Sequence, residues 1–395
     1  MSTQPKDQRL KSKALETRLT HTGRPDGAPS HAINLAPQRA STLLVNKAED
    51  LYAPGIKTYG LQGMDVHDAA KAALCTLEKA DHCILVESGL LACTLPIFTF
   101  VGAGDHVLLP GNVYGPTRRY CERSLKRLGG QVSYYNADIG ADIEGLIQDN
   151  TKLIILESPG SLTFEMPDIR AIVEVARKRE VLTALDNSWS AGVYLNPLDL
   201  GVDMSILATT KYAVGHADSF SGAILVKDKR IFSKLTEASA DLGLFTSADD
   251  AYLLLRGLRT LTVRMQRHQQ SALDIARWLN ELPEVEQVFH PALETDAYHQ
   301  LWKRDFTGAS GLFAFSINAA DDGTDLAFLN ALELFGLGFS YGGFESLAIN
   351  CGPQLKRSAT TPPSNKPIIR LAIGLEDPED LKQDLAQAFT SALRT

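Results

Sequence analysis

The chain has 395 residues, of which 44% are hydrophobic and 22% are charged, and it carries a formal net charge of −8 at pH 7. This is the composition of an ordinary globular protein, and the length allows one large and one smaller domain. The negative charge provides no field that would attract DNA, RNA or an anionic lipid surface. We therefore expect neither nucleic acid nor a membrane as a partner.

No apolar run reaches the length that a bilayer-spanning helix needs, and the N-terminus lacks the apolar core of a signal peptide. The five cysteines are odd in number and scattered, without a close metal-binding pair: Cys75, Cys83, Cys93, Cys121 and Cys351. A reducing, cytoplasmic setting without a metal site is expected. Cys83 and Cys93 lie near a candidate phosphate loop, but a buried thiol without a role is the favoured interpretation for both.

The first predicted element in chain order is a solvated, partly helical arm, because residues 6–18 are locally basic with acidic residues interspersed. Beyond the arm, apolar runs typical of strands alternate with segments of helical length. The strand candidates are 82–87, 106–109, 131–135, 152–157, 181–186, 204–209 and 222–226, and the helix candidates between them include 89–101, 115–128 and 168–179.

This alternation predicts the α/β class, with a mostly parallel sheet covered by helices on both faces. The apolar runs are continuous rather than alternating, which indicates strands buried on both sides. In open sheets of this kind, ligands collect at the carboxyl ends of the strands, so polar residues there are the first candidates for a site.

The pattern changes after Gly257. Residues 258–279 predict a long helix, and a separate α+β region begins near His290. In this region we expect strands over 311–317 and 368–373, a closing helix over 379–393 and an irregular loop over 358–366, which is rich in Ser, Thr and Pro.

Two strand ends carry the residues that a pyridoxal 5′-phosphate (PLP) site needs. Asp186 ends the apolar run 181–186, and Lys211 follows the run 205–209 with Thr210 beside it. An aspartate can keep the pyridine nitrogen protonated, so that the ring accepts electrons from a carbanion. A lysine can form the Schiff base, and the neighbouring hydroxyl can donate to the phosphate. The pair predicts an amino-acid-transforming enzyme with PLP as its cofactor.

A third strand end carries Gly89, which opens a helix in the segment 87–92. A glycine lets the backbone approach an anion closely, and a helix N-terminus supplies free N–H groups and a positive potential. Ser-Gly at a helix start is more often only a cap. Combined with Asp186 and Lys211, the segment predicts a cradle for the cofactor phosphate.

Four further residues leave alternatives open. Tyr114 follows the second strand candidate and could either stack on the pyridine ring and transfer protons or pack as a loop aromatic. The sequence around Tyr59 does not indicate a role for this residue. Arg370 is flanked by apolar residues in a strand, where a substrate α-carboxylate or a structural salt bridge could be its partner, and the salt bridge is slightly favoured. His216 is interpreted as a packed or hydrogen-bonding residue, not a metal ligand.

Taken together, these motifs resemble the Cys/Met-metabolism family of PLP enzymes, from about Leu15 to the C-terminus. Glu-Ser-Pro-Gly-Ser at 157–161, Arg-Asp-Phe-Thr-Gly at 304–308 and Gly-Gly-Phe-Glu-Ser at 342–346 resemble its bacterial β-lyase branch in particular. Further matching segments are 59–60, 104–107, 186–192, 210–212, 215–216, 257–261 and 370–377.

The resemblance implies a type I, aspartate-aminotransferase-like fold with a mostly parallel seven-stranded sheet and a smaller C-terminal α+β domain. It implies an arm contacting a neighbouring subunit over 1–62, a PLP-binding α/β domain over 63–257 and a C-terminal domain over 258–395. It also implies a homotetramer, built as a dimer of dimers with active sites at the subunit interfaces.

Roles carried over by motif fall into three groups. Lys211 resembles the Schiff-base lysine, while Tyr114 resembles the stacking tyrosine and Tyr59 the tyrosine that reaches in from a neighbouring subunit. The residues that resemble cofactor contacts are Lys211, Asp186, Tyr114, Gly89, Leu90, Thr210 and Tyr59. Arg370 with Ser340 resembles the group that holds the substrate carboxylate, and Tyr341 borders the substrate pocket.

Two positions depart from the family pattern. Many relatives have an arginine where this chain has Leu61, and that arginine grips the cofactor phosphate. Losing a charge-assisted contact costs about 1.5–3 kcal/mol unless another donor replaces it. We expect PLP to remain bound through Lys211 and Gly89, but less tightly. The second departure is Tyr341, where relatives often have tryptophan, and it bears on substrate preference.

The resemblance implies β-elimination of a small sulfur-containing amino acid, L-cystathionine, to homocysteine, pyruvate and ammonia. The nearest alternative is a carbon–sulfur lyase acting on cysteine, cystine or a specialised thioether, which Leu61 and Tyr341 leave open. A γ-lyase or γ-synthase agrees less well with the β-lyase-like segments. A weakened PLP-binding regulatory protein agrees poorly with the presence of Lys211, Asp186 and Arg370.

Overall fold

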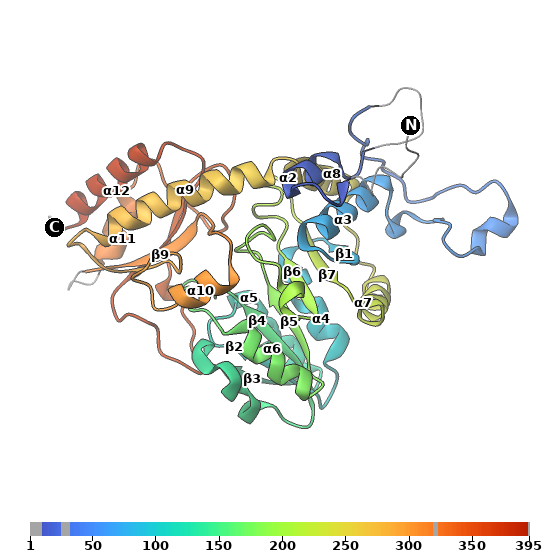
Figure 1. Ribbon diagram of the computed structural model, residues 1–395, viewed down its shortest axis with the longest axis horizontal. Helices are drawn as coiled ribbons and strands as arrows, with labels where there is room; N and C mark the ends of the chain where they lie inside the picture. The colour runs from blue at the N-terminus through green and yellow to red at the C-terminus, as the bar shows by residue number, and fades with distance from the viewer. Residues whose placement is uncertain (1–9, 25–31, 319–322, 394–395) are drawn as a thin grey trace.

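Seven strands form the larger of two sheets in the computed structural model, which describes residues 10–24, 32–318 and 323–393 (Figure 1). Their order is β1-β7-β6-β5-β4-β2-β3, and the pairs are parallel except those that β7 makes with β1 and β6. The strands are β1 (His82–Val86), β2 (His106–Pro110), β3 (Gln131–Tyr135), β4 (Thr151–Glu157), β5 (Leu182–Asp186), β6 (Met204–Leu207) and β7 (Gly222–Val226).

Helices cover both faces of this sheet because successive strand residues point to opposite sides. Ile84 and Val86 of β1 pack with α4 and α7, whereas Cys83 and Leu85 pack with α3 and α8. The elements around the sheet are α3 (Asp65–Glu78), α4 (Gly89–Phe100), α5 (Gly115–Tyr120), η3 (Cys121–Leu125), η4 (Ala137–Leu146), α6 (Ile169–Lys178), η5 (Pro197–Leu200), α7 (Lys229–Asp241) and α8 (Ala248–Leu258).

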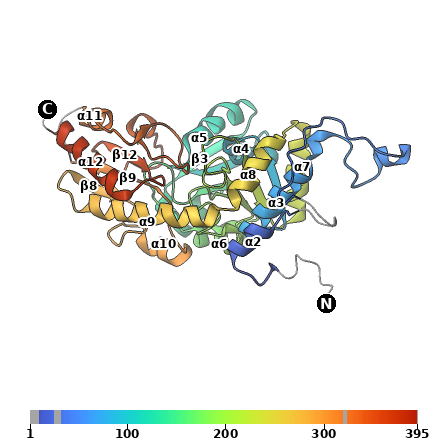
Figure 2. The same ribbon diagram turned by 90° about the horizontal axis from the view of Figure 1, so that it is seen from above.

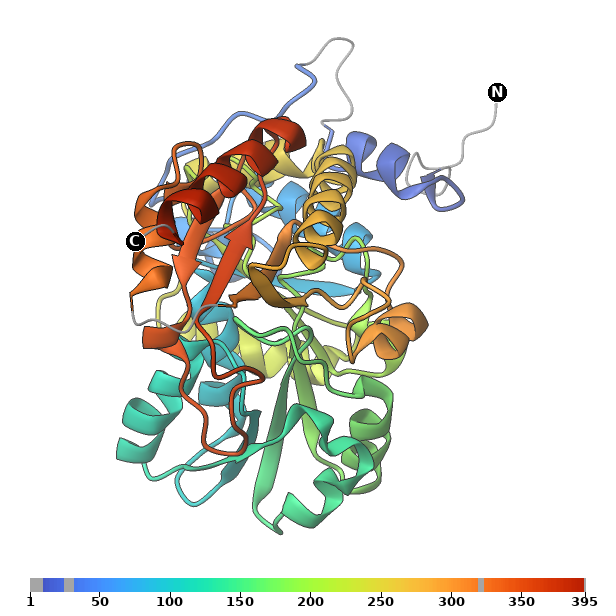
Figure 3. The same ribbon diagram turned by 90° about the vertical axis from the view of Figure 1, so that its left-hand side faces the viewer.

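Five strands form the smaller sheet, in the order β10-β11-β12-β9-β8, and only the β10–β11 pair is parallel. Figure 3 shows α9 and α12 side by side over one face, where their apolar residues share a core with the sheet. The elements are α9 (Leu261–Asn280), β8 (Val285–Phe289), α10 (His299–Asp305), β9 (Leu312–Ile317), α11 (Thr324–Asn330), β10 (Gly336–Leu337), β11 (Leu347–Asn350), η6 (Gly352–Gln354), β12 (Ile368–Ala372) and α12 (Pro378–Ala392).

The predicted fold class is confirmed: a mostly parallel seven-stranded sheet is followed by a smaller, separate sheet domain. Two helices differ from the prediction. The helix expected over 115–128 is α5 followed by the π-helical turn η3. The helix expected over 258–279 begins at Leu261, because Thr260 (φ −116°, ψ 8°) separates it from α8. Apolar periodicity could not show this break, since Leu258 and Leu261 are both buried.

The two sheets share one apolar core. Leu108, Ile154 and Leu185 of the larger sheet belong to the same buried cluster as Leu312 and Ile368 of the smaller one. Burial of this kind stabilises at roughly 25 cal/mol per Å² of apolar surface removed from water. The shared core therefore holds β5, which ends at Asp186, next to β12, which carries Arg370 of the candidate site.

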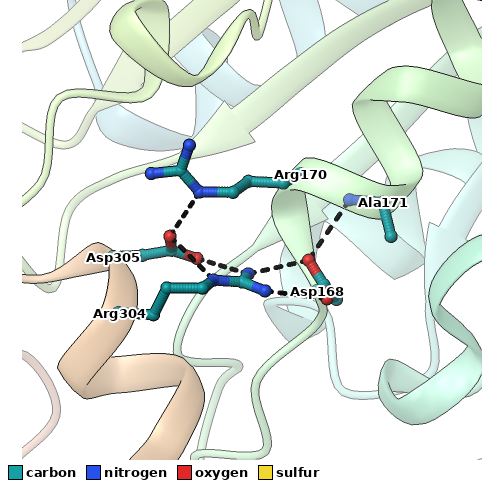
Figure 4. Close-up of polar contacts among 5 residues, drawn as sticks. All are labelled: Asp168, Arg170, Ala171, Arg304 and Asp305. Atoms are coloured by element: carbon teal, nitrogen blue, oxygen red, sulfur yellow. Dashed lines mark hydrogen bonds and ion pairs between the residues drawn. The ribbon is translucent and has the colours of Figure 1, made fainter.

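An ion-pair cluster also joins α6 to α10 (Figure 4). The Arg304 guanidinium donates to Asp168 and to Asp305 at 2.7 Å each, and Arg170 Nε donates to Asp305 at 2.7 Å. Asp168 also caps α6 by accepting from the backbone N–H of Ala171 at 3.2 Å, and Arg304 lowers the pKa of the Asp168 carboxyl. The Asp305 side chain is only 2% exposed, so this cluster is partly withdrawn from solvent.

The stretch of the N-terminal segment around η1 (Ala48–Tyr52) projects from the body of the molecule, whereas α2 (Leu15–His21) lies against α3 (Figures 1 and 2). The described part of the predicted arm contains α2 (Leu15–His21), η1 (Ala48–Tyr52) and η2 (Gly60–Gln62), while residues 6–9 of the basic stretch lie outside the described residues. Leu44 and Tyr52 are 93% and 92% exposed. Within the described residues, no helix is both long and apolar enough to cross a membrane.

Candidate active site

A cavity of about 600 Å³ opens at the carboxyl ends of the larger sheet's strands, against the smaller sheet. That volume is typical of a small-molecule site. The structure brings nine of the ten predicted site residues to its lining: Gly89, Leu90, Tyr114, Asp186, Thr210, Lys211, Ser340, Tyr341 and Arg370. The tenth, Tyr59, precedes η2, is 52% exposed and does not line this cavity within one chain.

Lys211 lies in the turn after β6, and its amine points into the cavity. Nζ donates to Ser340 Oγ at 2.7 Å and lies 4.8 Å from the ring centroid of Tyr341. Burial, reinforced by the positive charge of Arg370, lowers the pKa of Lys211 to about 8. A neutral amine is the form that attacks a carbonyl group and removes protons, so these surroundings favour the reactive form of Lys211.

Ser340 connects Lys211 to Arg370. Its hydroxyl accepts from Lys211, and its carbonyl oxygen accepts from Arg370 Nη2 at 2.9 Å. The backbone φ of Ser340 is +98°, a region that costs a non-glycine residue on the order of 1–3 kcal/mol. Backbone strain of this size is concentrated at functional sites, and Ser340 contacts both Lys211 and Arg370.

Arg370 lies in the middle of β12, paired with Ile349 of β11 and Ala314 of β9. No carboxylate among the described residues forms an ion pair with it, so the structural salt bridge that the local pattern slightly favoured is absent there. Its buried Nε has no hydrogen-bond partner in the described part of the chain. An unpartnered guanidinium N–H beside a cavity is suited to bind a carboxylate.

Asp186 ends β5, and both of its carboxylate oxygens accept hydrogen bonds. Oδ1 accepts from the backbone N–H of Ser188 at 3.0 Å, and Oδ2 accepts from Cys93 Sγ at 3.3 Å. Burial, with the nearby charges of Asp186 and Glu157, raises the pKa of Cys93, which keeps the thiol protonated and donating. Cys93 is buried as expected, but it is a neighbour of the candidate pyridinium partner and not an isolated thiol.

Glu157 ends β4 in register with Asp186, and it also lines the cavity. Its Oε2 accepts from the backbone N–H of Tyr114 at 2.7 Å, which fixes the start of α5. Burial, followed by the charge of Asp186, raises the pKa of Glu157 well above its usual value. The ends of β4 and β5 therefore place two carboxyl groups side by side: burial raises the pKa of Glu157, and Asp186 accepts hydrogen bonds from two donors.

The candidate phosphate cradle lies where α4 begins. Ser88 Oγ accepts from Leu91 N at 3.2 Å, and the first turn leaves the N–H groups of Gly89 and Leu90 without intrahelical acceptors. A Cβ at position 89 would lie 2.4 Å from the Cβ of Ala208, so only glycine permits this approach. Thr210 Oγ1 lines the same cavity and donates to the Ser219 carbonyl at 2.8 Å.

Two tyrosines border the cavity. Tyr114 is 40% exposed, and partial burial raises its pKa, with Cys93 and Asp186 contributing to the shift. Tyr341 packs against Tyr212 with ring centroids 5.6 Å apart, and burial raises its pKa well above the usual range. Both phenols therefore stay protonated near neutral pH, available as hydrogen-bond donors.

His216 makes the hydrogen bond that the sequence favoured, with Nδ1 lying 2.8 Å from the Val214 carbonyl oxygen. Within the described ranges, no three His, Cys, Asp or Glu side chains are arranged to hold a metal ion. The five cysteines are free thiols in this structure.

Comparison with known proteins assigns the family. Residues 16–390 match the model of the Cys/Met metabolism PLP-dependent enzymes. The chain is 40% identical to cystathionine beta-lyase MetC of Escherichia coli K12 over 394 residues, which cover 96% of this chain and 99% of that protein. It is 39% identical to cystathionine beta-lyase of Bordetella avium, with 96% and 98% covered. The chain belongs to the Cys/Met-metabolism family of PLP-dependent enzymes.

Solved structures of this family share the fold. The crystal structure of metB from Corynebacterium glutamicum superposes with a TM-score of 0.90 at 28% identity, covering 96% of this chain and 98% of that one. The family's cofactor is PLP. The residues present fit that group, since a glycine-bounded helix N-terminus, a buried lysine with a lowered pKa and a strand-end carboxylate face one cavity.

Glu157 and Cys93 line the cavity and contact predicted site residues, but the sequence analysis did not predict them as site residues. Glu157 ends an apolar strand just as Asp186 does, so the same signal could have found it. Cys93 lies one helical turn after Gly89, which places it beside the phosphate cradle, but its contact with Asp186 depends on how α4 packs against β5. The local sequence pattern does not indicate how α4 and β5 pack.

Proposed function

We propose that this PLP-dependent enzyme is a cystathionine β-lyase, cleaving L-cystathionine to homocysteine, pyruvate and ammonia in methionine biosynthesis. The observation that carries the proposal is the joint placement of Lys211, Asp186 and Arg370 in one cavity. The β-lyase names of full-length relatives at 39–40% identity support the choice of reaction.

In this proposal the chain's own residues bind, orient and move protons. PLP supplies the electron sink that stabilises negative charge at the substrate Cα. Asp186 would hold the pyridine nitrogen, and the backbone N–H groups of Gly89 and Leu90 would hold the phosphate. Thr210 would join them by turning its hydroxyl proton away from the Ser219 carbonyl, to which it donates in this structure. Arg370 would bind the substrate α-carboxylate, positioned by the carbonyl of Ser340.

Proton transfer is assigned to two side chains. Lys211, whose pKa is lowered to about 8, would remove the Cα proton and could return it to the departing thiolate. Tyr114, close to Asp186 and protonated, would assist exchange of the substrate amine with Lys211. Tyr341 borders the amine of Lys211 and would limit the shape of the thioether that enters.

We also propose that the enzyme is a homotetramer built as a dimer of dimers in the cytoplasm. Tyr59 would then enter the site of a neighbouring subunit, which agrees with its position outside the cavity of its own chain. The exposed apolar residues of the arm support an intersubunit role. Five free thiols agree with a reducing compartment.

The deciding experiment is product identification after mixing the PLP-loaded enzyme with L-cystathionine. β-Elimination would give pyruvate and homocysteine, whereas γ-elimination would give 2-oxobutyrate and cysteine, and the two pairs are separable by mass spectrometry. Lys211→Ala should abolish both products. Near-wild-type turnover in that variant, or the absence of pyruvate with the wild type, would overturn the assignment and favour another sulfur amino acid as substrate.

A further inference from the structure

The cavity extends beyond the residues assigned so far. Its lining continues from Tyr114 along α5 and η3 to Arg119 and Arg123, and it includes Lys356 from the segment after η6. These three exposed cations lie on the helix and the loop that border the opening. The proposed chemistry at Lys211, Asp186 and Arg370 does not use them.

Within the described residues, none of these three cations has a charged partner. Across residues 10–24, 32–318 and 323–393, no carboxylate forms an ion pair with Arg119, Arg123 or Lys356. Two other basic residues in this part of the cavity lining, Arg118 and Arg357, do form ion pairs. Arg118 donates to Glu122 at 3.3 Å and lies 3.7 Å from the ring centroid of Tyr134, while Arg357 pairs with Glu165 at 3.6 Å.

The arrangement is electrostatically unfavourable without an anion. Arg119 and Arg123 are four residues apart, a spacing at which like charges on a helical segment repel each other. Glu122 is a carboxylate at this end of the lining, but Arg118 and the Tyr134 hydroxyl, at 3.1 Å, already donate to it. The outer end of the cavity is therefore a positive subsite with unused guanidinium donors.

Of these three cations, Arg119 is the one whose charge acts on Tyr114. It follows Tyr114 by five residues, and its charge acts on the Tyr114 phenol, partly offsetting the rise in the pKa of that group. Arg370, by contrast, reaches the cavity from β12 of the other sheet. Arg119 of α5 and Arg370 of β12 thus reach one cavity, and the candidate proton-transfer residues Lys211 and Tyr114 also line it.

We propose that Arg119, supported by Arg123 and Lys356, binds a second carboxylate of the substrate, so that the enzyme selects thioether amino acids carrying a carboxylate at each end. The inference rests on the proposed β-elimination. Arg370 would take the α-carboxylate next to the reacting carbon, and Arg119 would take the far one. A guanidinium suits this task because its planar fork can bind a carboxylate through two parallel hydrogen bonds.

The test compares two substrates that share the reacting half. L-Cystathionine carries the far carboxylate, and S-ethyl-L-cysteine lacks it. The readout is the ratio of their kcat/KM values in Arg119→Gln, which keeps hydrogen-bonding capacity but loses the charge. The matched control is Arg127→Gln, because Arg127 is exposed, unpaired among the described residues and outside the cavity lining.

In Arg119→Gln the ratio should fall about 10- to 100-fold, the usual effect of losing a charge-assisted hydrogen bond, and mainly through KM for cystathionine. Arg119→Lys should recover part of the loss, and the ratio in Arg127→Gln should equal that of the wild type. An unchanged ratio in Arg119→Gln, or an equal loss for both substrates, would overturn the proposal.

A binding measurement separates this proposal from the proposed reaction. Calorimetry with glutarate and butyrate compares a ligand having two carboxylates with one having a single carboxylate, independently of turnover. Glutarate should bind more tightly than butyrate to the wild type, and Arg119→Gln should remove the difference. If the wild type releases no pyruvate but still binds glutarate more tightly than butyrate, the proposed β-elimination is wrong and the carboxylate subsite is supported. If the wild type binds the two ligands equally, the carboxylate subsite is wrong.

Discussion

Lys211 is a buried amine beside a guanidinium, and these surroundings determine its protonation. Its pKa is lowered to about 8, first by burial and then by Arg370, so the neutral form appears at lower pH than in an exposed lysine. Only the neutral amine reacts with an aldehyde. The rate at which apoenzyme takes up PLP should therefore rise with pH with a midpoint near 8, measured by stopped-flow absorbance.

The control for this experiment is the reaction of PLP with Nα-acetyl-lysine, which removes the contribution of PLP's own ionisations. Arg370→Gln removes a nearby positive charge, so the midpoint should move to higher pH. A wild-type midpoint close to 10.5, the value of an unperturbed lysine, would show that the amine is not desolvated in solution.

At the residue scale, the sequence predicted the carboxylate and lysine at the ends of β5 and β6 because each directly follows an apolar run. It could not predict that Ser340 would contact both Lys211 and Arg370. That arrangement depends on a turn with a positive φ and on the placement of the second sheet. The roles assigned to the individual site residues stay predictions until variants are measured.

At the scale of elements, the ion-pair cluster between α6 and α10 should contribute measurably to stability. Asp305 is nearly buried and accepts from Arg170 and Arg304, whose side chains are 51% and 39% exposed. Partial exposure limits the gain, so Asp305→Asn should lower the free energy of unfolding by about 1–2 kcal/mol. Urea denaturation of the PLP-loaded enzyme measures the change.

The matched control is Glu174→Gln in α6, which breaks a pair with Lys178 whose members are 69% and 68% exposed. Solvent screens the attraction between two exposed side chains, so the control should scarcely change the denaturation midpoint. If the two substitutions lower the free energy of unfolding equally, the burial of Asp305 does not strengthen its ion pairs.

Most elements were predictable because their apolar periods match their geometry, and β3 and β7 agree with the predicted ranges residue for residue. The misplaced boundaries lie at η3 and Thr260, where buried residues continue through a change of helix geometry. Apolar spacing reports which face is buried. It does not report a π-helical turn or a break between two helices that pack on the same core.

At the scale of the whole molecule, the projecting arm should mediate assembly. Leu44 and Tyr52 are almost fully exposed in the single chain, and large apolar side chains on a projecting segment usually mark an interaction surface. Leu44→Asp combined with Tyr52→Asp should shift the enzyme toward smaller species, measured by size-exclusion chromatography with light scattering.

Asn46→Asp is the control for this shift, because it adds a negative charge to the same arm without removing an apolar side chain. Retention of the wild-type mass in the double variant would exclude these two residues from the interface. The division into an arm over 1–62 and domains over 63–257 and 258–395 stays a prediction, although each sheet lies within one of the two expected domains.

The order of the site residues along the chain has a consequence for synthesis. The residues proposed to hold PLP within one chain lie between Gly89 and Lys211, whereas Ser340, which contacts Lys211, follows it by 129 residues. At 5–20 residues per second, the ribosome needs roughly 6–26 s to cover that interval. The ribosome therefore completes all seven strands of the larger sheet before it makes β12, whose Arg370 is proposed to bind the substrate carboxylate, so PLP can be present while the second sheet folds.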